Sequence, residues 1–387
     1  MSGTPTDGYC RELLPLIQWA AGDGTAVQPY GNHHPYMEPT LIRTMRGSAR
    51  GVDVFRERHV TTEWATRAFE EHMLKGAKGE IPRVASLAEL HRWMAPFIKR
   101  RVAEEPDVAK YVRTPAYEIM HTVVPWDDQY LGYWRGIADE FAEWYRTVRA
   151  DDGEDAKHLN LTALLARIGA VLRAGNDPGG AAISGRAPYP CLTSKQRYAI
   201  ERAVLHARAG HKTVVHAQNP RLSEQLAREI RKTGMEALAL HGNVPIKTRD
   251  RLLLGEFRLG RVNVLVATVG VFRTGLNVPE ASRGLFAARS WTAKEEQQAT
   301  YRILRPQQTK KALFEVLELP GSLDTYQGML LDFKLDAARA AVDHRVPSGD
   351  LDDFLHMDTV IERFVTNLAT HRGVAPRNLR ESLKHAP

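Results

Sequence analysis

Apolar positions in the second half of the chain alternate between short β-type runs and helical periods. Continuous apolar or β-branched runs predict buried strands at 213–217, 237–240, 262–268 and 312–319. Between them, apolar residues recur at three- and four-residue spacing, which predicts helices at 193–209, 223–233, 246–259 and 295–304. Strands that alternate with helices of about ten residues predict an α/β fold in which a parallel sheet carries helices on both faces.

The first part of the chain is irregular at its start and then becomes helical. Apolar residues recur at helical spacing in 87–99, 127–149 and 159–173. The stretch 176–192 contains several Pro and Gly residues and predicts a linker. We therefore expect an amino-terminal region over 1–175, this linker, a lobe over 193–342, and a helical and polar tail over 343–387.

Aromatic and acidic residues around position 127 have structural interpretations. Trp126, Trp134 and Trp144 could stack on nucleic-acid bases, but at helical spacing they are typical packing residues. Asp127 and Asp128 stand where a helix is predicted to begin, so they are interpreted as capping residues that compensate the helix dipole.

Composition limits the class of protein. The 387 residues are 43% hydrophobic and 26% charged, which is typical of globular proteins, and they contain no apolar run long enough to cross a membrane. Cys10 and Cys191 are the two cysteines, and their separation favours a reducing, cytoplasmic compartment and gives no metal site. The net charge of +7 is compatible with binding a polyanion.

Two stretches carry candidate chemistry. The strand ending at Thr268 leads into a loop with glycines, a pattern that can place backbone N–H groups against a phosphate at the carboxyl end of a parallel strand. About 30 residues later, one helical face is predicted to carry Gln298, Arg302 and Arg305. Arginine suits phosphate recognition because its planar, permanently charged fork donates two hydrogen bonds at once.

These stretches, in this order, resemble motifs V and VI of superfamily 2 helicases and translocases. Residues 298–309, Gln-Ala-x-x-Arg-x-x-Arg-x-x-Gln-Thr, resemble in particular the Swi/Snf-type family, except that Pro306-Gln307 replaces the usual Ile-Gly. The resemblance implies a RecA-like second motor lobe. It also implies catalytic roles for Gln298, Arg302 and Arg305, and a nucleotide cleft lined by Gly275 and Asn277.

The resemblance extends upstream. Residues 212–219 resemble the family's motif IV strand, and Leu240-His241-Gly242 followed by Arg249 resembles a further family element. Residues 93–124 resemble the segment between the family's lobes, and Met1–Thr6 resemble motif III, which couples nucleotide state to DNA contact. The resemblance implies nucleic-acid contacts by six residues: Ser2, Thr4, Gln218, His241, Arg249 and Thr268.

The family's first lobe carries a phosphate loop and a magnesium-binding acidic box, and neither pattern occurs in these 387 residues. We therefore expect the C-terminal half of a split DNA-dependent ATPase. ATP and Mg²⁺ would be held mainly by a separate chain that supplies the N-terminal lobe, and the pair would track double-stranded DNA. A non-catalytic module that binds DNA or protein, and a true start upstream of Met1, are the alternatives.

Overall fold

The computed structural model describes most of the chain, and the following account refers to these residues: 10–21, 51–63, 79–97, 99, 101, 105–112, 115–150, 161–272, 277–289, 293–328 and 357–370. They divide into two compact units. The first comprises residues 1–105 and 329–359, and the second comprises 106–328 and 360–387. The predicted boundaries at 175 and 193 stay a prediction. No described helix is both long and apolar enough to cross a bilayer.

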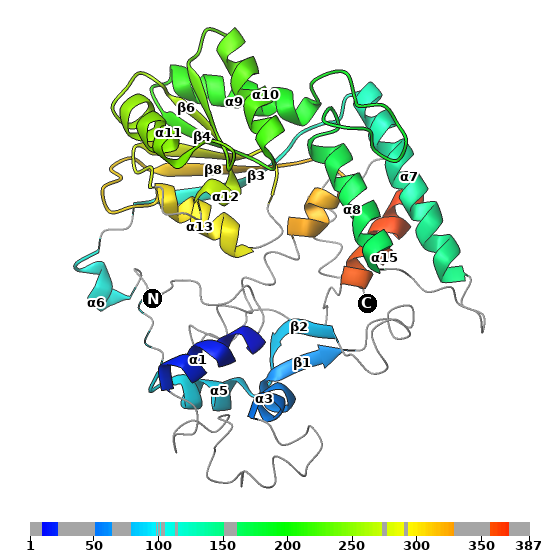
Figure 1. Ribbon diagram of the computed structural model, residues 1–387, viewed down its shortest axis with the longest axis vertical. Helices are drawn as coiled ribbons and strands as arrows, with labels where there is room; N and C mark the ends of the chain where they lie inside the picture. The colour runs from blue at the N-terminus through cyan, green and yellow to red at the C-terminus, as the bar shows by residue number, and fades with distance from the viewer. Residues whose placement is uncertain are drawn as a thin grey trace. The chain divides into compact units, whose positions relative to one another are not determined.

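The first unit is small and mixes helices with one β-hairpin (Figure 1). Its elements are η1 (Cys10–Glu12), α1 (Leu13–Ala21), α3 (Gly51–His59), β1 (Val60–Glu63), β2 (Gly79–Val84) and α5 (Leu87–Met94). β1 and β2 pair in antiparallel fashion. Helix α5 is shorter than the predicted 87–99, since Pro96 follows its end. The buried core of this first unit includes Leu13, Ile17, Phe55 and Leu90.

The second unit is built on a parallel sheet. Its six described strands are ordered β3-β8-β7-β4-β6-β5, and all neighbours are parallel. The strands are β3 (Tyr117–Val123), β4 (Lys212–Ala217), β5 (Ala237–Leu240), β6 (Val264–Thr268), β7 (Ala281–Phe286) and β8 (Ala312–Glu318). The predicted parallel sheet is confirmed. Strand β3 adds an edge strand from the segment that resembles an interlobe connection.

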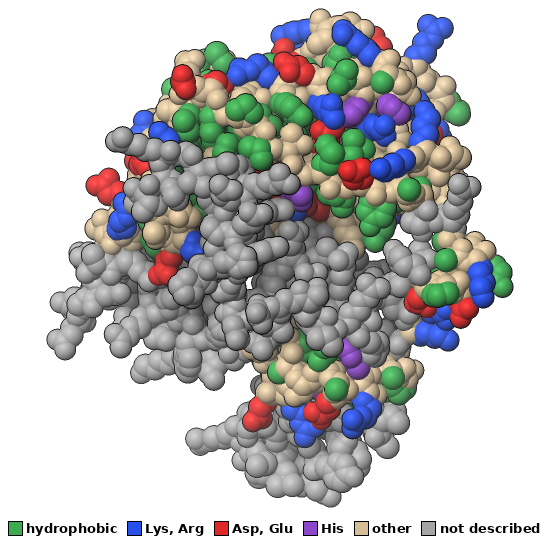
Figure 2. All heavy atoms as spheres, turned by 180° about the vertical axis from the view of Figure 1, so that it is seen from behind, with side chains coloured by type: hydrophobic (Ala, Val, Ile, Leu, Met, Phe, Trp, Pro, Cys, Tyr) green, Lys and Arg blue, Asp and Glu red, His purple; other side chains and the backbone are tan. Residues whose placement is uncertain are grey.

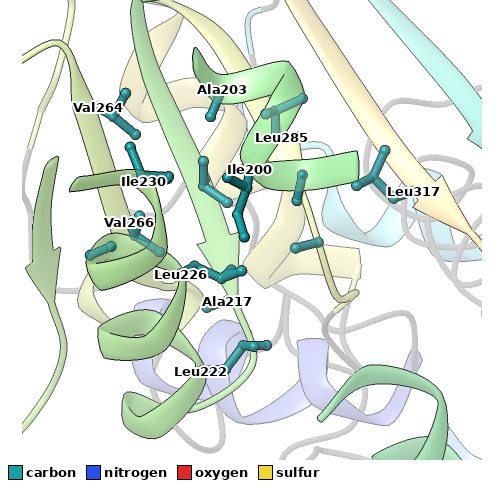
Figure 3. Close-up of a cluster of buried hydrophobic side chains, with 14 of the residues drawn as sticks. Ile200, Ala203, Ala217, Leu222, Leu226, Ile230, Val264, Val266, Leu285 and Leu317 are labelled. Atoms are coloured by element: carbon teal, nitrogen blue, oxygen red, sulfur yellow. The ribbon is translucent and has the colours of Figure 1, made fainter. Parts of the chain in front are cut away.

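Helices cover both faces of this sheet (Figure 1). On one face, α9 (Ser194–Arg208) and α10 (Pro220–Lys232) bury the apolar cluster of Figure 3, which contains Ile200 and Leu226 of these helices together with Val264 and Val266 of β6. On the other face, α13 (Ala293–Ile303), α12 (Val269–Phe272) and the π-helix η2 (Leu252–Arg258) bury a second cluster. The RecA-like architecture expected from the sequence is therefore confirmed.

Capping residues explain where the two helices of the first face begin. Thr193 forms a capping box with Gln196, so α9 begins at Ser194, as the sequence predicts within one residue. Helix α10 begins earlier than predicted, because Asn219 and not Ser223 is its N-cap. The Ser223 hydroxyl lies inside the helix and donates to the carbonyl of Val266, 2.9 Å away.

A helical hairpin stands beside the sheet. It consists of α7 (Asp128–Ala150) and α8 (Leu161–Asn176), and α15 (Met357–Thr370) packs against it through Phe364 (Figure 1). The Asp127 carboxylate accepts a hydrogen bond from the Tyr130 amide at 2.7 Å, which confirms Asp127 as a capping residue. Trp134 is buried, which supports the packing interpretation of the tryptophans.

Short helical turns connect the remaining elements. Helix α6 (Pro106–Ala109) precedes β3, and α11 (Ile246–Arg251) continues without a break into η2. The sequence predicts one helix over 246–259, and the structure divides it into an α-helical and a π-helical part.

Candidate functional site

The arginine pair predicted from the sequence shares one hydrogen-bond acceptor. Arg302 Nη1 donates to Asn277 Oδ1 at 3.3 Å, and Arg305 Nη2 donates to the same oxygen at 2.7 Å. An amide oxygen has two lone pairs, so it accepts both guanidinium groups without adding charge. Three residues that are up to 28 positions apart in the sequence therefore form one cluster.

Backbone contacts fix the position of Arg302. Its Nε donates to the carbonyl of Phe272 at 2.9 Å, and its own carbonyl accepts from the Val278 amide at 2.9 Å. Burial lowers the pKa of Arg302, and the neighbouring Arg305 lowers it further. The guanidinium remains charged at neutral pH, because an arginine pKa lies far above 7. The two arginines therefore concentrate positive charge where the chain after α12 meets the end of α13.

The turn after Arg305 is held by Gln308, a residue of the Gln-Thr pair in the motif. The Gln308 side chain donates to the carbonyls of Pro279, at 2.8 Å, and Ala281, and its backbone amide donates to the carbonyl of Arg305. Its Oε1 accepts from the Lys310 amide at 2.9 Å. Gln308 thus ties the arginine-bearing turn to the start of β7.

Three of the predicted nucleic-acid contacts lie at or directly after the carboxyl ends of adjacent strands. Gln218 follows β4, Thr268 ends β6, and His241 follows β5. Because Ala217 pairs with Thr268 and Leu240 pairs with Ala267, these ends lie at one edge of the sheet. Gln218 is exposed, whereas Thr268 and His241 are buried.

His241 has an acidic neighbour that the sequence did not indicate. Its Nε2 lies 2.9 Å from the carboxylate of Glu224 on α10. A hydrogen bond to a carboxylate fixes the orientation of the imidazole ring. Arg249 lies on α11, and its Nε is buried without a hydrogen-bond partner among the described residues.

Other predicted residues are less informative. Gln298 is half-buried on α13, one turn before Arg302. Gly275, Ser2 and Thr4 lie outside the described residues. No group of three or more His, Cys, Asp or Glu side chains with the geometry of a metal site occurs within the described part of the chain.

Arg258 and Glu280 belong to the cluster, but the sequence reasoning did not find them. Arg258 Nη2 donates to the backbone carbonyl of Asn277 at 2.9 Å, and Arg258 Nε lies 2.7 Å from Glu280 Oε1. Arg258 ends a segment that is rich in arginine, so its position in the sequence does not distinguish it from solvent-facing neighbours such as Arg261.

Chemically, the cluster can bind an anion. The guanidinium groups of Arg302 and Arg305 are both bonded to the neutral side-chain oxygen of Asn277, and together they present several N–H donors. Such groups stabilise negative charge on a phosphoryl group without taking part in proton transfer. No general base needs to be supplied by these residues for that role.

Comparisons with known proteins identify the sheet-bearing part of the chain. Residues 195–307 match the model of the helicase conserved C-terminal domain. The UvrABC system protein B of Chlorobium chlorochromatii is 40% identical over 78 residues, which are 20% of this chain and 11% of that protein. The chain spans a quarter or less of the length of the curated relatives that it matches.

Solved structures that resemble the chain include Swi2/Snf2 ATPase domains. The C-terminal part of the Fun30 ATPase domain has a TM-score of 0.49 at 12% identity, over 67% of this chain and 100% of that one. The Sulfolobus solfataricus SWI2/SNF2 ATPase C-terminal domain has a TM-score of 0.43 at 16% identity, over 70% and 100% respectively. By its match to the family model, the segment 195–307 is a helicase conserved C-terminal domain.

Proposed function

We propose that this chain supplies the second lobe of an ATP-driven DNA translocase of the Swi/Snf type. The observation that carries the proposal is the cluster in which Asn277 accepts hydrogen bonds from both Arg302 and Arg305. In the proposed enzyme the two guanidinium groups face the γ-phosphate of ATP and stabilise the charge that develops on it. Gln298, one helical turn earlier, belongs to the same catalytic surface.

The nucleotide itself is held by a lobe that these 387 residues do not include. They contain neither the phosphate-loop pattern nor the acidic box, so ATP and Mg²⁺ bind mainly to a separate N-terminal lobe. We expect Asn277 to line the cleft from this side, together with Gly275, which lies outside the described residues. The carboxyl edge of a parallel sheet, where β6 ends, is the usual location for such a cleft.

The nucleic-acid partner in this proposal is duplex DNA, contacted through its backbone. We expect backbone contacts by Gln218 and Arg249, and by Thr268 and His241 at the carboxyl ends of their strands. Ser2 and Thr4, which lie outside the described residues, stay predicted contacts. On the face seen in Figure 2, Lys and Arg side chains alternate with Asp and Glu. Contacts to the phosphate backbone carry little sequence information, so tracking along the duplex is expected and not recognition of a site.

A reconstitution experiment tests the enzymatic part. The purified chain is mixed with the product of the reading frame directly upstream, provided that it carries the phosphate loop and acidic box, and phosphate release is measured with DNA and Mg²⁺. We expect no release by this chain alone and DNA-stimulated release by the mixture. Arg305→Ala should reduce that release by roughly 10³-fold or more, because the charge on the transferred phosphoryl group loses its donor.

The exposed Arg261→Ala is the matched control, because it removes the same charge from a neighbouring position and should leave hydrolysis unchanged. Hydrolysis by this chain alone, or equal rates for Arg305→Ala and the wild type, would contradict the proposal. Absence of stimulation in the mixture, together with DNA binding by the chain, would instead support the non-catalytic binding module.

Binding to DNA is tested separately, by fluorescence anisotropy of a labelled duplex at several salt concentrations. Arg249→Ala should weaken binding and reduce the slope of log K against log salt by about 1, as expected for the loss of one phosphate contact. An unchanged slope would remove Arg249 from the proposed surface.

A further inference from the structure

We propose that Arg258 is a positioning residue for the arginine pair and acts through Asn277. The inference rests on the proposed function, because it holds that a third arginine fixes the positions of the Arg302 and Arg305 side chains. Arg258 does not touch the reacting atoms in this proposal. It fixes the residue to which the other two guanidinium groups are bonded.

The contacts of Arg258 define its role. Nη2 donates to the backbone carbonyl of Asn277 at 2.9 Å, and Nε forms an ion pair with Glu280 at 2.7 Å. Both partners lie in the segment 277–280, which leads into β7. The side chains of Arg258 and Glu280 are about one-third exposed or less, so the pair is partly shielded from water.

Asn277 therefore bonds three guanidinium groups through two different oxygens. Its side-chain Oδ1 takes Arg302 and Arg305, and its backbone oxygen takes Arg258. Like charges repel, and Arg305 indeed lowers the pKa of Arg302. Holding two arginines on one neutral oxygen requires that this oxygen keeps its place, and the contact to Arg258 supplies that constraint.

The π-helix explains why Arg258 reaches Asn277. Leu253 and Phe257, four residues apart in η2, are buried in the core of the sheet face. The Lys212 ammonium donates to the carbonyl of Phe257 and, at 3.0 Å, to that of Val262, which holds the carboxyl end of η2. π-helical turns are rare and occur frequently at functional sites. Because the carbonyls of Phe257 and Val262 are both bonded to Lys212, the backbone that carries the Arg258 side chain is held in place.

Removing the Arg258 side chain should loosen Asn277 without dismantling the core. Since Val278 donates its amide to the carbonyl of Arg302, the exchange rate of this N–H reports directly on the contact between the two segments. Arg258→Lys keeps the charge but has a single donor nitrogen and lacks the guanidinium fork, so its effect should be smaller than that of Arg258→Ala.

The first measurement is hydrogen–deuterium exchange by mass spectrometry on the isolated full chain. For Arg258→Ala we expect exchange at Val278 to rise about tenfold or more, with an intermediate rate for Arg258→Lys and the wild-type rate for Arg261→Ala. The thermal unfolding midpoint identifies any variant that fails to fold. Unchanged exchange at Val278 in a folded Arg258→Ala protein would overturn the inference.

The second measurement uses the reconstituted mixture. Arg258→Ala should lower kcat for ATP by about 10- to 100-fold and leave KM within about twofold, because misplaced arginines lose contact mainly with the transition state. An increase in KM with unchanged kcat would overturn the positioning role. Because the exchange experiment needs no partner, failure of the mixture to hydrolyse ATP would count against the proposed function and not against the role of Arg258.

Discussion

His216 is an unusual residue for the centre of a sheet, because neither of its ring nitrogens has a hydrogen-bond partner among the described residues. The imidazole is 0% exposed and stacks on Phe286 with ring centroids 4.3 Å apart, while Phe272 meets it edge-on. Burial lowers the pKa of His216 from 6.5 to about 3. The side chain is therefore a neutral, aromatic packing residue in the folded protein.

This environment predicts acid sensitivity. The folded-state pKa is below the unfolded value, so the unfolded chain binds the extra proton, and stability is full above pH 6.5 and falls as the pH drops towards 3. For a single titrating site, protonation of His216 in the unfolded chain should lower the free energy of unfolding by about 3 kcal/mol at pH 4. His216→Phe should remove this part of the pH dependence in urea unfolding between pH 7 and 4. Equal acid sensitivity of variant and wild type would contradict it.

At the residue scale, the sequence indicated the charged groups of the site but not their neutral connections. Arg302 and Arg305 could be found because they stand four and seven positions after Gln298 in a pattern that resembles a family motif. The prediction that both lie on one helical face holds for Arg302 alone, since α13 ends at Ile303 and Arg305 follows it. The shared bond to Asn277 and the contribution of Arg258 depend on the path of the chain after α12, for which the residue types carry no pattern. The partner of His241, Glu224, lies on α10, whose other acidic residue, Glu229, bonds to Lys232 instead, so the sequence does not single out Glu224.

At the element scale, a buried ion pair joins helix α9 to the helical residues 323–328 that follow β8. The Lys195 ammonium, 1% exposed, donates to Asp324 Oδ2 at 2.7 Å and to Asn176 Oδ1 at 2.8 Å. Asn176 ends α8, so the Lys195 side chain connects α9, the helical residues 323–328 and the helical hairpin. The Asp324 carboxylate also accepts from the Leu319 amide, which leaves it well satisfied.

Lys195→Met should therefore lower the free energy of unfolding by about 3–5 kcal/mol, because it leaves a buried carboxylate without its counter-ion. Urea unfolding followed by circular dichroism measures the change. Lys232→Met is the matched control: it breaks an exposed pair with Glu229 and should cost less than about 1 kcal/mol. Similar losses for the two variants would disprove the structural role of Lys195.

Strand β7 shows why one element was missed from the sequence. Its residues, Ala-Ser-Arg-Gly-Leu-Phe, include polar and glycine positions that lower strand propensity. A Cβ placed on Gly284 would lie 2.5 Å from the Phe314 ring of β8, so glycine provides the space for that aromatic side chain. The requirement comes from a neighbour 30 residues away and is invisible in the local pattern. Strand β6 was predictable because it is almost continuously apolar, and β4 because Thr213, Val214 and Val215 form a β-branched run.

At the scale of the whole molecule, the two units each have an apolar core, and the second unit combines the sheet with the helical hairpin. Trp126 connects hairpin and sheet, since its Nε1 donates to the carbonyl of Pro320 at 2.8 Å just after β8. Its ring lies 5.0 Å from that of Trp134 and 4.9 Å from that of Tyr130, centroid to centroid.

Two indole rings at this distance are close enough for their electronic transitions to couple, which gives the protein a built-in optical signal. We expect an exciton couplet in the far-ultraviolet circular dichroism that disappears in Trp126→Phe and persists in Trp19→Phe, whose indole is 89% exposed. A couplet that survives Trp126→Phe would contradict the assignment. During unfolding, the loss of this signal would report when the hairpin separates from the sheet, and no fluorescent label would have to be attached to the protein.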